Sequence, residues 1–250
     1  MGLLEFARTQ EILRRELPPP PAVVLDVGGG PGAYALWLAR EGYEVHLVDP
    51  VPLHLEQARA ASRSQPDHPV ASFTVGDAGS LSYAGGADAV LLLGPLYHLT
   101  DRADRVRALR EACRVLHAGG VVLAAVISRF ASALDGLVRG LFTDPRFTPM
   151  VLRDLAEGQH RNETENPTFF TTAYFHRPEE LQGEMEEAGL RHAATLAVEG
   201  PAWMLQDLET RWNDPRWREI ILDIIRRIEG EPALAGVSAH IIGVGRRPQR

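Results

Sequence analysis

The chain has no lysine: all 26 basic residues among its 250 residues are arginines. This absence excludes pyridoxal phosphate enzymes, which need a lysine Schiff base, and phosphate-loop enzymes, which need a lysine on the nucleotide. The basic residues are outnumbered by 33 acidic residues, which gives a net charge of -7. Because phosphate backbones bind basic surfaces, we expect no nucleic-acid partner.

Cysteine and long apolar runs are also scarce. The single Cys113 cannot form an internal disulfide, and its place on a helical face predicts a buried core residue in a reducing compartment. No run of 18 apolar residues occurs, so we expect no membrane span. Residues 1–17 are typical of an amphipathic helix and not of a signal peptide, and we therefore expect a cytoplasmic protein.

Two catalytic signatures are missing. Histidine, cysteine and acidic residues nowhere have the spacing of a metal-ligand set, and no Gly-x-Ser-x-Gly elbow is present. We therefore expect neither a metal centre nor a serine hydrolase.

The most informative stretch that is present runs from Val23 to Arg40. Residues 23–26 predict a buried strand, glycines 28, 29, 30 and 32 predict a turn, and residues 33–40 predict a helix. A strand, a glycine turn and a helix N-terminus form a nucleotide-binding corner, because a backbone without Cβ atoms lets a ligand approach closely. Asp26, Gly28 and Gly30 belong to the order Asp-x-Gly-x-Gly-x-Gly. This order resembles the first motif of the class I S-adenosylmethionine-dependent methyltransferases.

A dinucleotide-binding corner is the main competing interpretation. Its pattern Gly-x-Gly-x-x-Gly is matched by Gly28 and Gly30, with Ala33 as a tolerated third residue. A pyrophosphate favours bare N–H groups without a neighbouring carboxylate, whereas S-adenosylmethionine carries positive charge and no phosphate. The acid at this turn therefore favours S-adenosylmethionine.

Two further acids follow at the expected places. Residues 43–49 predict a second strand that ends at Asp49, 19 residues after Gly30, where a carboxylate can bind ribose hydroxyls in either cofactor class. Residues 71–78 predict a third strand that ends in Gly-Asp-Ala. The resemblance implies that Asp77 and the backbone of Ala78 bind the adenine.

The remaining elements complete an α/β pattern. A fourth strand (87–92) continues into the loop 93–99, a helix (101–117) is stopped by Gly119 and Gly120, and a fifth strand covers 121–128. A helix at 177–189 and strands at 190–198 and 239–245 follow. The resemblance implies one methyltransferase domain over residues 1–250. Its fold would be a Rossmann-like, mostly parallel seven-stranded sheet with an antiparallel last strand and helices on both faces. It also places Leu93 among the cofactor-binding residues.

Three segments lie outside this pattern: the N-terminal helix 1–17 and the insertions 129–175 and 202–236. The first insertion is too long for a simple connection, so we expect both insertions to form lid or cap structures. The second insertion carries an apolar stripe from Trp217 to Ile228. We expect this stripe to pack on the body of the protein, and a homodimer contact remains an alternative.

The acceptor side is expected beyond the carboxyl ends of the strands, where Tyr97 and His98 leave the fourth strand. His98 can act as a general base, or it can cap the following helix; Tyr97 can pack on the cofactor or the acceptor. In the first insertion, His160, Arg161 and Tyr174 are candidates for binding a small molecule, and an ordinary loop is the alternative.

We therefore expect S-adenosylmethionine-dependent methyl transfer to a small-molecule acceptor. The loop 93–98 lacks the Asn/Asp-Pro-Pro-Tyr/Phe sequence of the enzymes that methylate amide or base nitrogens, which disfavours nucleic-acid and glutamine acceptors. An NAD-dependent oxidoreductase and a non-catalytic S-adenosylmethionine-binding protein remain the alternatives.

Overall fold

Strands and helices alternate through most of the chain. The computed structural model describes residues 2–164 and 166–249. The strands are β1 (Val23–Val27), β2 (Glu44–Asp49), β3 (Ser72–Val75), β4 (Ala87–Leu92), β5 (Leu116–Ser128), β6 (Gln159–His160), β7 (Ala173–His176), β8 (Arg191–Ala197) and β9 (His240–Arg246).

The helices lie between these strands and at the N-terminus. The α-helices are α1 (Leu3–Glu16), α2 (Ala33–Arg40), α3 (Pro52–Arg63), α4 (Pro95–His98), α5 (Arg102–Val115), α6 (Ala131–Arg139), α7 (Phe147–Glu157), α8 (Pro178–Glu187), α9 (Leu208–Asn213), α10 (Pro215–Ile228) and α11 (Pro232–Ala235). Short 3₁₀ helices are η1 (Leu141–Thr143), η2 (Pro167–Phe169) and η3 (Gly200–Met204). Within the described residues, no helix has the length and apolar composition that crossing a membrane requires.

Seven strands form the sheet that the sequence predicts, in the order β3-β2-β1-β4-β5-β9-β8. Strands β1 to β5 pair with one another in parallel, whereas β9 is antiparallel to both β5 and β8. Strand β7 adds to the end of β5 at Ile127 and Ser128, and β6 pairs with β7. The predicted mixed sheet with an antiparallel last strand is therefore confirmed, with β6 and β7 as additions.

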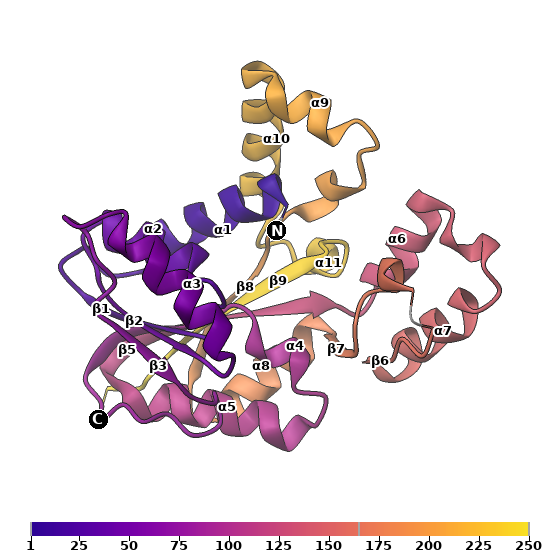
Figure 1. Ribbon diagram of the computed structural model, residues 1–250. Coiled ribbons are helices and arrows are strands. Elements are labelled where there is room, and N and C mark those ends of the chain that lie inside the picture. The colour runs from indigo at the N-terminus through magenta and orange to yellow at the C-terminus, as the bar shows by residue number, and fades with distance from the viewer. Residues whose placement is uncertain (1, 165, 250) are drawn as a thin grey trace.

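Alternate residues of the central strands face two separate cores. Leu91 and Leu123 pack in the core that includes α1, α2 and α3, and Val90 and Val122 pack in the core that includes α5 and α8. Figure 1 shows α2 and α3 on one side of the sheet and α5 and α8 on the other. The strands are apolar on both faces, as buried parallel strands should be.

The predicted helix 101–117 and its glycine stop are wrong at the C-terminal end. Helix α5 ends at Val115, and Gly119 and Gly120 lie inside β5. The amide of Gly119 donates to the carbonyl of Arg247, whose own amide donates to the carbonyl of Gly120. These bonds to the chain beyond β9 hold the glycines in the sheet. Cys113 is half-buried on α5 and packs against the core that includes α5 and α8, so the prediction of a fully buried position is wrong.

The first insertion forms a lobe at the carboxyl end of the sheet. This inserted lobe (residues 129–175) contains α6, η1, α7, β6 and η2 and returns through β7. Phe147 and Met150 of α7 pack with Phe169 in a small core of their own. Figure 1 shows α6 and α7 beyond the end of β5, set apart from the helices that cover the sheet.

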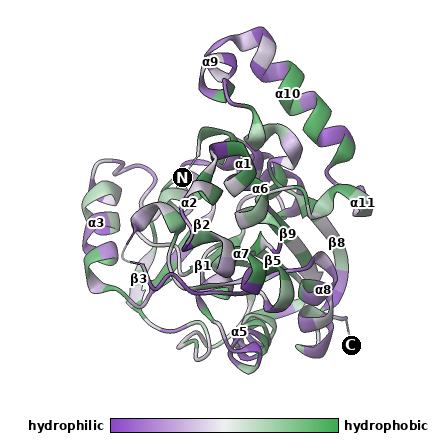
Figure 2. Cartoon of the chain, turned by 90° about the vertical axis from the view of Figure 1, so that its right-hand side faces the viewer, coloured by the Kyte–Doolittle hydropathy of each residue, from purple (hydrophilic) through white to green (hydrophobic). Residues whose placement is uncertain are grey.

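The second insertion contains α9, α10 and α11. In Figures 1 and 2, α9 and α10 project away from the sheet beside the N-terminal end of α1. Ile221 of α10 packs against Leu4 of α1 in a third core. Three other apolar side chains of α10 are exposed: Trp217, Ile220 and Ile224. The predicted apolar stripe is therefore divided between a packed side and an exposed side.

Helix α1 is fixed to the body by a buried arginine. The side chain of Arg8 is fully buried, its Nε donates to the carbonyl of Val198 at 3.2 Å, and its guanidinium pairs with Glu11 and Glu229. Glu229 also pairs with Arg15 at 2.6 Å. These bonds hold α1 beside the end of β8.

Candidate functional site

The glycine turn between β1 and α2 forms one wall of a cavity. Gly28, Gly30 and Gly32 have φ values of +68°, +56° and +84°, which side chains with a Cβ rarely adopt. A Cβ on Gly28 would lie 2.5 Å from Cγ of Pro95, whereas a Cβ on Gly30 would meet no protein atom within 4 Å. Glycine is therefore required at position 28 because α4 approaches closely. At position 30 it is required because of the backbone conformation, and the space beside it is open.

Asp49 joins this turn to the loop after β2. Its Oδ2 accepts from the amide of Gly30 at 2.9 Å, and its Oδ1 accepts from the amide of Val51 at 2.9 Å. The ring of His54 also lies 3.0 Å from Oδ1 through Nδ1. The carboxylate is nearly buried and lines the cavity, so it is oriented before any ligand arrives.

The cavity has a volume of about 340 Å³ and is closed by the segments after β3 and β4. The predicted residues Asp77, Ala78, Tyr97 and His98 all line it. The loop expected after β4 contains the short helix α4, which carries Tyr97 and His98 toward the cavity. Partial burial lowers the pKa of His98, which favours its neutral form.

The charge of this lining is acidic. Asp49 and Asp77 are its acidic residues, His54 and His98 are its titratable bases, and no arginine is among the described residues that line it. A pyrophosphate bound here would meet carboxylates without a compensating guanidinium. The cavity therefore suits a cofactor that carries positive charge or none.

Asp26 and Leu93 do not line the cavity, although both were predicted to bind the cofactor. Asp26 is fully buried beneath the turn, and neither of its carboxylate oxygens accepts a hydrogen bond from the described residues. A Cβ on Gly29 would lie 2.4 Å from Oδ2 of Asp26, so the carboxyl supports the turn from behind. Burial raises the pKa of Asp26 to about 7. Leu93 packs against the core on the α1 side of the sheet.

A second cavity of about 280 Å³ lies between the inserted lobe, η3 and the adjacent ends of β5 and β9. Its aromatic lining residues are Phe147, Phe169, Phe170, Phe175 and Trp203. The hydroxyl of Ser132 lines it and is buried without a hydrogen-bond partner among the described residues. His240 also lines it, at the start of β9. Such a cavity suits a flat apolar molecule with a few polar substituents.

Tyr97 lies between the two cavities. It lines the first cavity and packs against the cluster of Ile127, Ala173 and Phe175, in which Ile127 and Phe175 line the second cavity. Burial, followed by the negative charge of Glu5, raises the pKa of Tyr97, so its hydroxyl stays protonated. The glycine-walled cavity and the aromatic cavity therefore lie next to each other at this side chain.

The three residues predicted in the inserted lobe are not brought together. His160 lines the second cavity, but its Nδ1 is 2.8 Å from Asp154 and its Nε2 is 2.7 Å from the carbonyl of Phe169. With both nitrogens engaged, the ring is part of the lobe's framework. Arg161 is exposed and lines neither cavity.

Like His160, Tyr174 contacts other side chains of the protein; unlike His160, it lines neither cavity. The guanidinium carbon of Arg105 lies 3.7 Å from its ring centroid, and Nη2 of Arg129 donates to its hydroxyl at 3.1 Å. Arg105 also pairs with Glu184 at 2.8 Å, with both side chains buried. The predicted substrate contact of Tyr174 is therefore not supported by its position, because the ring joins the lobe to α5 and α8.

Sequence reasoning missed His54, Ser132 and His240. His54 lies five residues after Asp49 on the first turn of α3, and this spacing is a signal that could have been used. Ser132 and His240 had no comparable signal, because they are 108 residues apart in the chain and become neighbours of one cavity only through the β5–β9 pairing.

Comparison with known proteins places the first half of the chain in a recognised family. A family model described as a methyltransferase domain matches residues 24–120. The chain is 39% identical over 123 residues to the methyltransferase GfsG of Streptomyces halstedii. This match covers 48% of this chain and 40% of that protein. It is 31% identical over 193 residues to a ubiquinone biosynthesis O-methyltransferase of Methylobacterium nodulans. This match covers 74% of this chain and 66% of that protein. Both alignments span less than two thirds of these relatives.

The fold has close counterparts among solved structures. A structure described as a SAM-dependent methyltransferase of Methanosarcina mazei superposes with a TM-score of 0.65 and covers 96% of this chain and 98% of its own. The two sequences are 18% identical, so this likeness concerns the fold alone.

Proposed function

The chain belongs to the class I S-adenosylmethionine-dependent methyltransferase family, and from this premise we propose that it methylates a small-molecule acceptor. The observation that carries the proposal is the position of Tyr97 between two cavities. The glycine-walled cavity holds the residue types that the family uses for its cofactor, and the aromatic cavity offers a separate space for an acceptor. A reaction between two bound molecules needs this adjacency.

The cofactor residues proposed are Gly28, Gly30, Asp49, Asp77 and Ala78. Asp49 is fixed by the amides of Gly30 and Val51 and would bind the ribose hydroxyls. Asp77 and the backbone of Ala78 would bind the adenine. Asp26 packs behind the turn and is not among these residues. When bound, S-adenosylmethionine supplies an activated methyl group, so the protein's contribution is orientation and exclusion of water.

The acceptor proposed is a small molecule with an apolar, largely aromatic body. Support comes from the five aromatic residues that line a cavity of about 280 Å³. The inserted lobe would act as the lid over this acceptor. A nucleic-acid acceptor is disfavoured by the net charge of -7.

Methyl transfer is favoured over the two alternatives. An NAD-dependent oxidoreductase would place a pyrophosphate against Asp49 and Asp77 without an arginine in the described lining. A non-catalytic binding protein would not need a second cavity that meets the first at Tyr97.

The test has two stages. Calorimetry should detect binding of S-adenosylmethionine and none of NAD; the reverse result would support the oxidoreductase. Labelled methyl from S-adenosylmethionine should then enter a product when the protein is incubated with a metabolite extract of the source organism. Binding without any labelled product would support the non-catalytic alternative.

His98 is retained as a proposed catalytic residue with its own test. If it removes a proton from the acceptor, His98→Ala should lower kcat by roughly 10²–10⁴-fold with cofactor affinity unchanged. If it only positions a ligand, KM should rise instead. Arg161→Ala serves as a matched variant, since its exposed position predicts unchanged kinetics.

Location and assembly are also part of the proposal. The cytoplasm, expected from the sequence, is tested by cell fractionation. A homodimer would cover the exposed side of α10 formed by Trp217, Ile220 and Ile224, and sedimentation of wild-type protein and Ile224→Glu tests it.

A further inference from the structure

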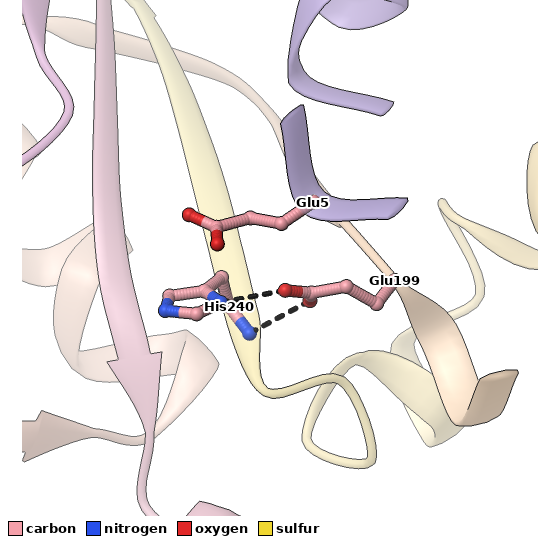
Figure 3. A group of neighbouring side chains, drawn as sticks. All are labelled: Glu5, Glu199 and His240. Carbon is pink, nitrogen blue, oxygen red and sulfur yellow. Dashed lines mark hydrogen bonds and ion pairs between the residues drawn. The ribbon is translucent and has the colours of Figure 1, made fainter. Parts of the chain in front are cut away.

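A histidine–carboxylate pair lies at the wall of the aromatic cavity and is not used by the function proposed above. Nδ1 of His240 is 2.6 Å from Oε1 of Glu199, and the backbone amide of His240 donates to Oε2 at 3.0 Å. Figure 3 shows that the other ring nitrogen, Nε2, is turned away from Glu199. Within residues 2–164 and 166–249, no group forms a hydrogen bond to this nitrogen, and His240 lines the cavity.

We propose that His240, and not His98, is the general base that deprotonates a hydroxyl group of a neutral aromatic acceptor, and that Glu199 positions the ring of His240. The proposal rests on the methyl transfer proposed above. The acceptor's O–H bond breaks, its proton passes to Nε2 of His240, and the electron pair of the bond stays on the oxygen. The resulting oxygen nucleophile carries no proton when it receives the methyl group, and the imidazolium later releases its proton to solvent through the open cavity.

The tautomer required for this role is fixed by the structure. A carboxylate that accepts from Nδ1–H leaves the lone pair of Nε2 free to accept a proton. Glu199 is itself held rigidly, because Ser238 donates its hydroxyl to Oε2 at 2.9 Å and accepts from the amide of Glu199 at 3.0 Å. The Glu199–His240 pair therefore lies at the start of β9, and the imidazole ring of His240 lines the acceptor cavity.

The surrounding charges increase the basicity of the ring. Atoms of Glu5, Glu199 and His240 lie within 4.8 Å of one another, and Figure 3 shows the carboxylate of Glu5 above the ring. Although burial lowers the pKa of His240, the charge of Glu199 and then that of Glu5 raise it above its ordinary value. Across the cavity the titratable groups are His160 and the ion pair of Asp135 with Arg139, in which Arg139 Nη1 lies 3.0 Å from Asp135.

The same three residues are close enough to hold a metal ion, but their bonds favour the base. Both oxygens of Glu199 already accept hydrogen bonds from His240 and Ser238, and a metal ion would displace these donors. Glu199 also has a pKa below its ordinary value: burial acts to raise it, and His240 and Ser238 more than offset that effect. The carboxylate is thus stabilised by donors of the chain itself.

The chemistry of the cavity defines the acceptor. The aromatic residues Phe170 and Phe175 suit a flat ring, and the hydroxyl of Ser132, which has no hydrogen-bond partner in the described part of the chain, can bind a second polar substituent. The negative charge of Glu5 disfavours a carboxylate beside the reacting hydroxyl. A phenol with an uncharged polar substituent fits these requirements.

The first test uses p-nitrophenol, whose phenol and phenolate forms absorb at different wavelengths. Trp203 lines the cavity, so quenching of its fluorescence reports binding. At a pH one unit below the probe's ordinary pKa, the bound probe should contain several-fold more phenolate than the free probe. His240→Gln should abolish this gain, and Glu199→Gln should reduce it. His192→Gln, at the end of β8 that lies opposite Gly245 and away from Glu199, should leave it unchanged. No binding, a neutral bound probe, or equal ionisation in His240→Gln would each overturn the proposal.

The second test uses the acceptor found by the labelling experiment. His240→Gln should lower kcat about 10²–10⁴-fold with KM nearly unchanged, and Glu199→Gln should move the acidic limb of the kcat–pH profile to lower pH. Undiminished kcat in His240→Gln would refute the base while leaving methyl transfer intact. Loss of wild-type turnover in EDTA would overturn the base in favour of a metal ion. Failure of the wild type to bind S-adenosylmethionine would instead refute the proposed function, and the p-nitrophenol result would still stand.

Discussion

Replacing Asp26 by asparagine should stabilise the cofactor-free protein at neutral pH. The carboxyl is fully buried, and its pKa is raised from 3.8 to about 7, chiefly by burial; the backbone amide of Ala35 acts to lower this pKa, and the charge of Asp49 acts to raise it. Because this pKa is higher in the folded state than in the unfolded state, the folded state binds more protons between these values. The contribution of this carboxyl to stability is therefore greatest below pH 3.8 and is lost as the pH rises through 7.

The magnitude follows from the two pKa values. At about 1.4 kcal/mol for each pKa unit, complete ionisation costs about 4 kcal/mol above pH 7. Integration between about pH 5 and pH 8 gives a loss of about 2.5 kcal/mol over that interval. Asparagine has the same shape and does not ionise, so Asp26→Asn avoids this loss. Its buried amide has a desolvation cost of about 1–3 kcal/mol, but that cost does not depend on pH.

The assay is urea unfolding of both proteins at pH 5 and pH 8 without cofactor. The stability of Asp26→Asn relative to wild type should improve by about 2–3 kcal/mol from the lower to the higher pH. Asp67→Asn, at an exposed position, is the control and should show no such change. A difference between Asp26→Asn and wild type that is the same at both pH values would refute the reasoning.

Three further predictions concern the cofactor site and α1. Asp49→Ala should weaken S-adenosylmethionine binding by about 10- to 150-fold in calorimetry, since lost hydrogen bonds to a charged group cost about 1.5–3 kcal/mol; unchanged affinity would remove Asp49 from the site. Gly30→Val should abolish binding while circular dichroism shows a folded protein, because the side chain would enter the cavity; wild-type affinity would contradict this. Arg8→Met should cost about 3–5 kcal/mol in urea unfolding by leaving Glu229 without its buried partner, and Arg15→Met, at an exposed partner of the same carboxylate, should cost less than about 1 kcal/mol; equal losses would refute the burial argument.

The sequence was most informative where chemistry is local. The strand, glycine turn and helix from Val23 to Arg40 were predicted with their bounds nearly correct, because each residue's neighbours in the chain determine its role. Asp49 at the end of β2 and Asp77 just after β3 were located in the sequence for the same reason. In contrast, the end of α5 was misplaced, because Gly119 bonds to Arg247, a partner more than 100 residues away.

The acceptor side was predicted less well, because it is built by long-range packing. His160 was predicted to bind a small molecule because it is a polar residue among aromatics. Its two ring nitrogens instead form hydrogen bonds within the inserted lobe. Tyr174 lies in the same sequence cluster, but alternation along β7 turns it toward Arg105 and turns Phe175 toward the cavity. His240 had no neighbour in the sequence that indicated its pairing with Glu199. The length of the insertion predicted the lobe, and only the fold determined which of its residues face the acceptor space.

The distribution of charge also restricts the order in which the site can be filled. The described lining of the first cavity has carboxylates and no arginine, so a positively charged cofactor neutralises it on binding. The second cavity has Glu199 and Glu5 behind His240, and its one lining arginine, Arg139, is paired with Asp135 at its edge. Transfer of the acceptor's proton to His240 leaves the net charge of this region unchanged, but release of that proton to solvent before the cofactor is bound would add negative charge to a region that is already negative. Cofactor binding should therefore precede release of this proton to solvent, because the positive charge that the cofactor brings to the far side of Tyr97 lowers the energy of the ionised acceptor.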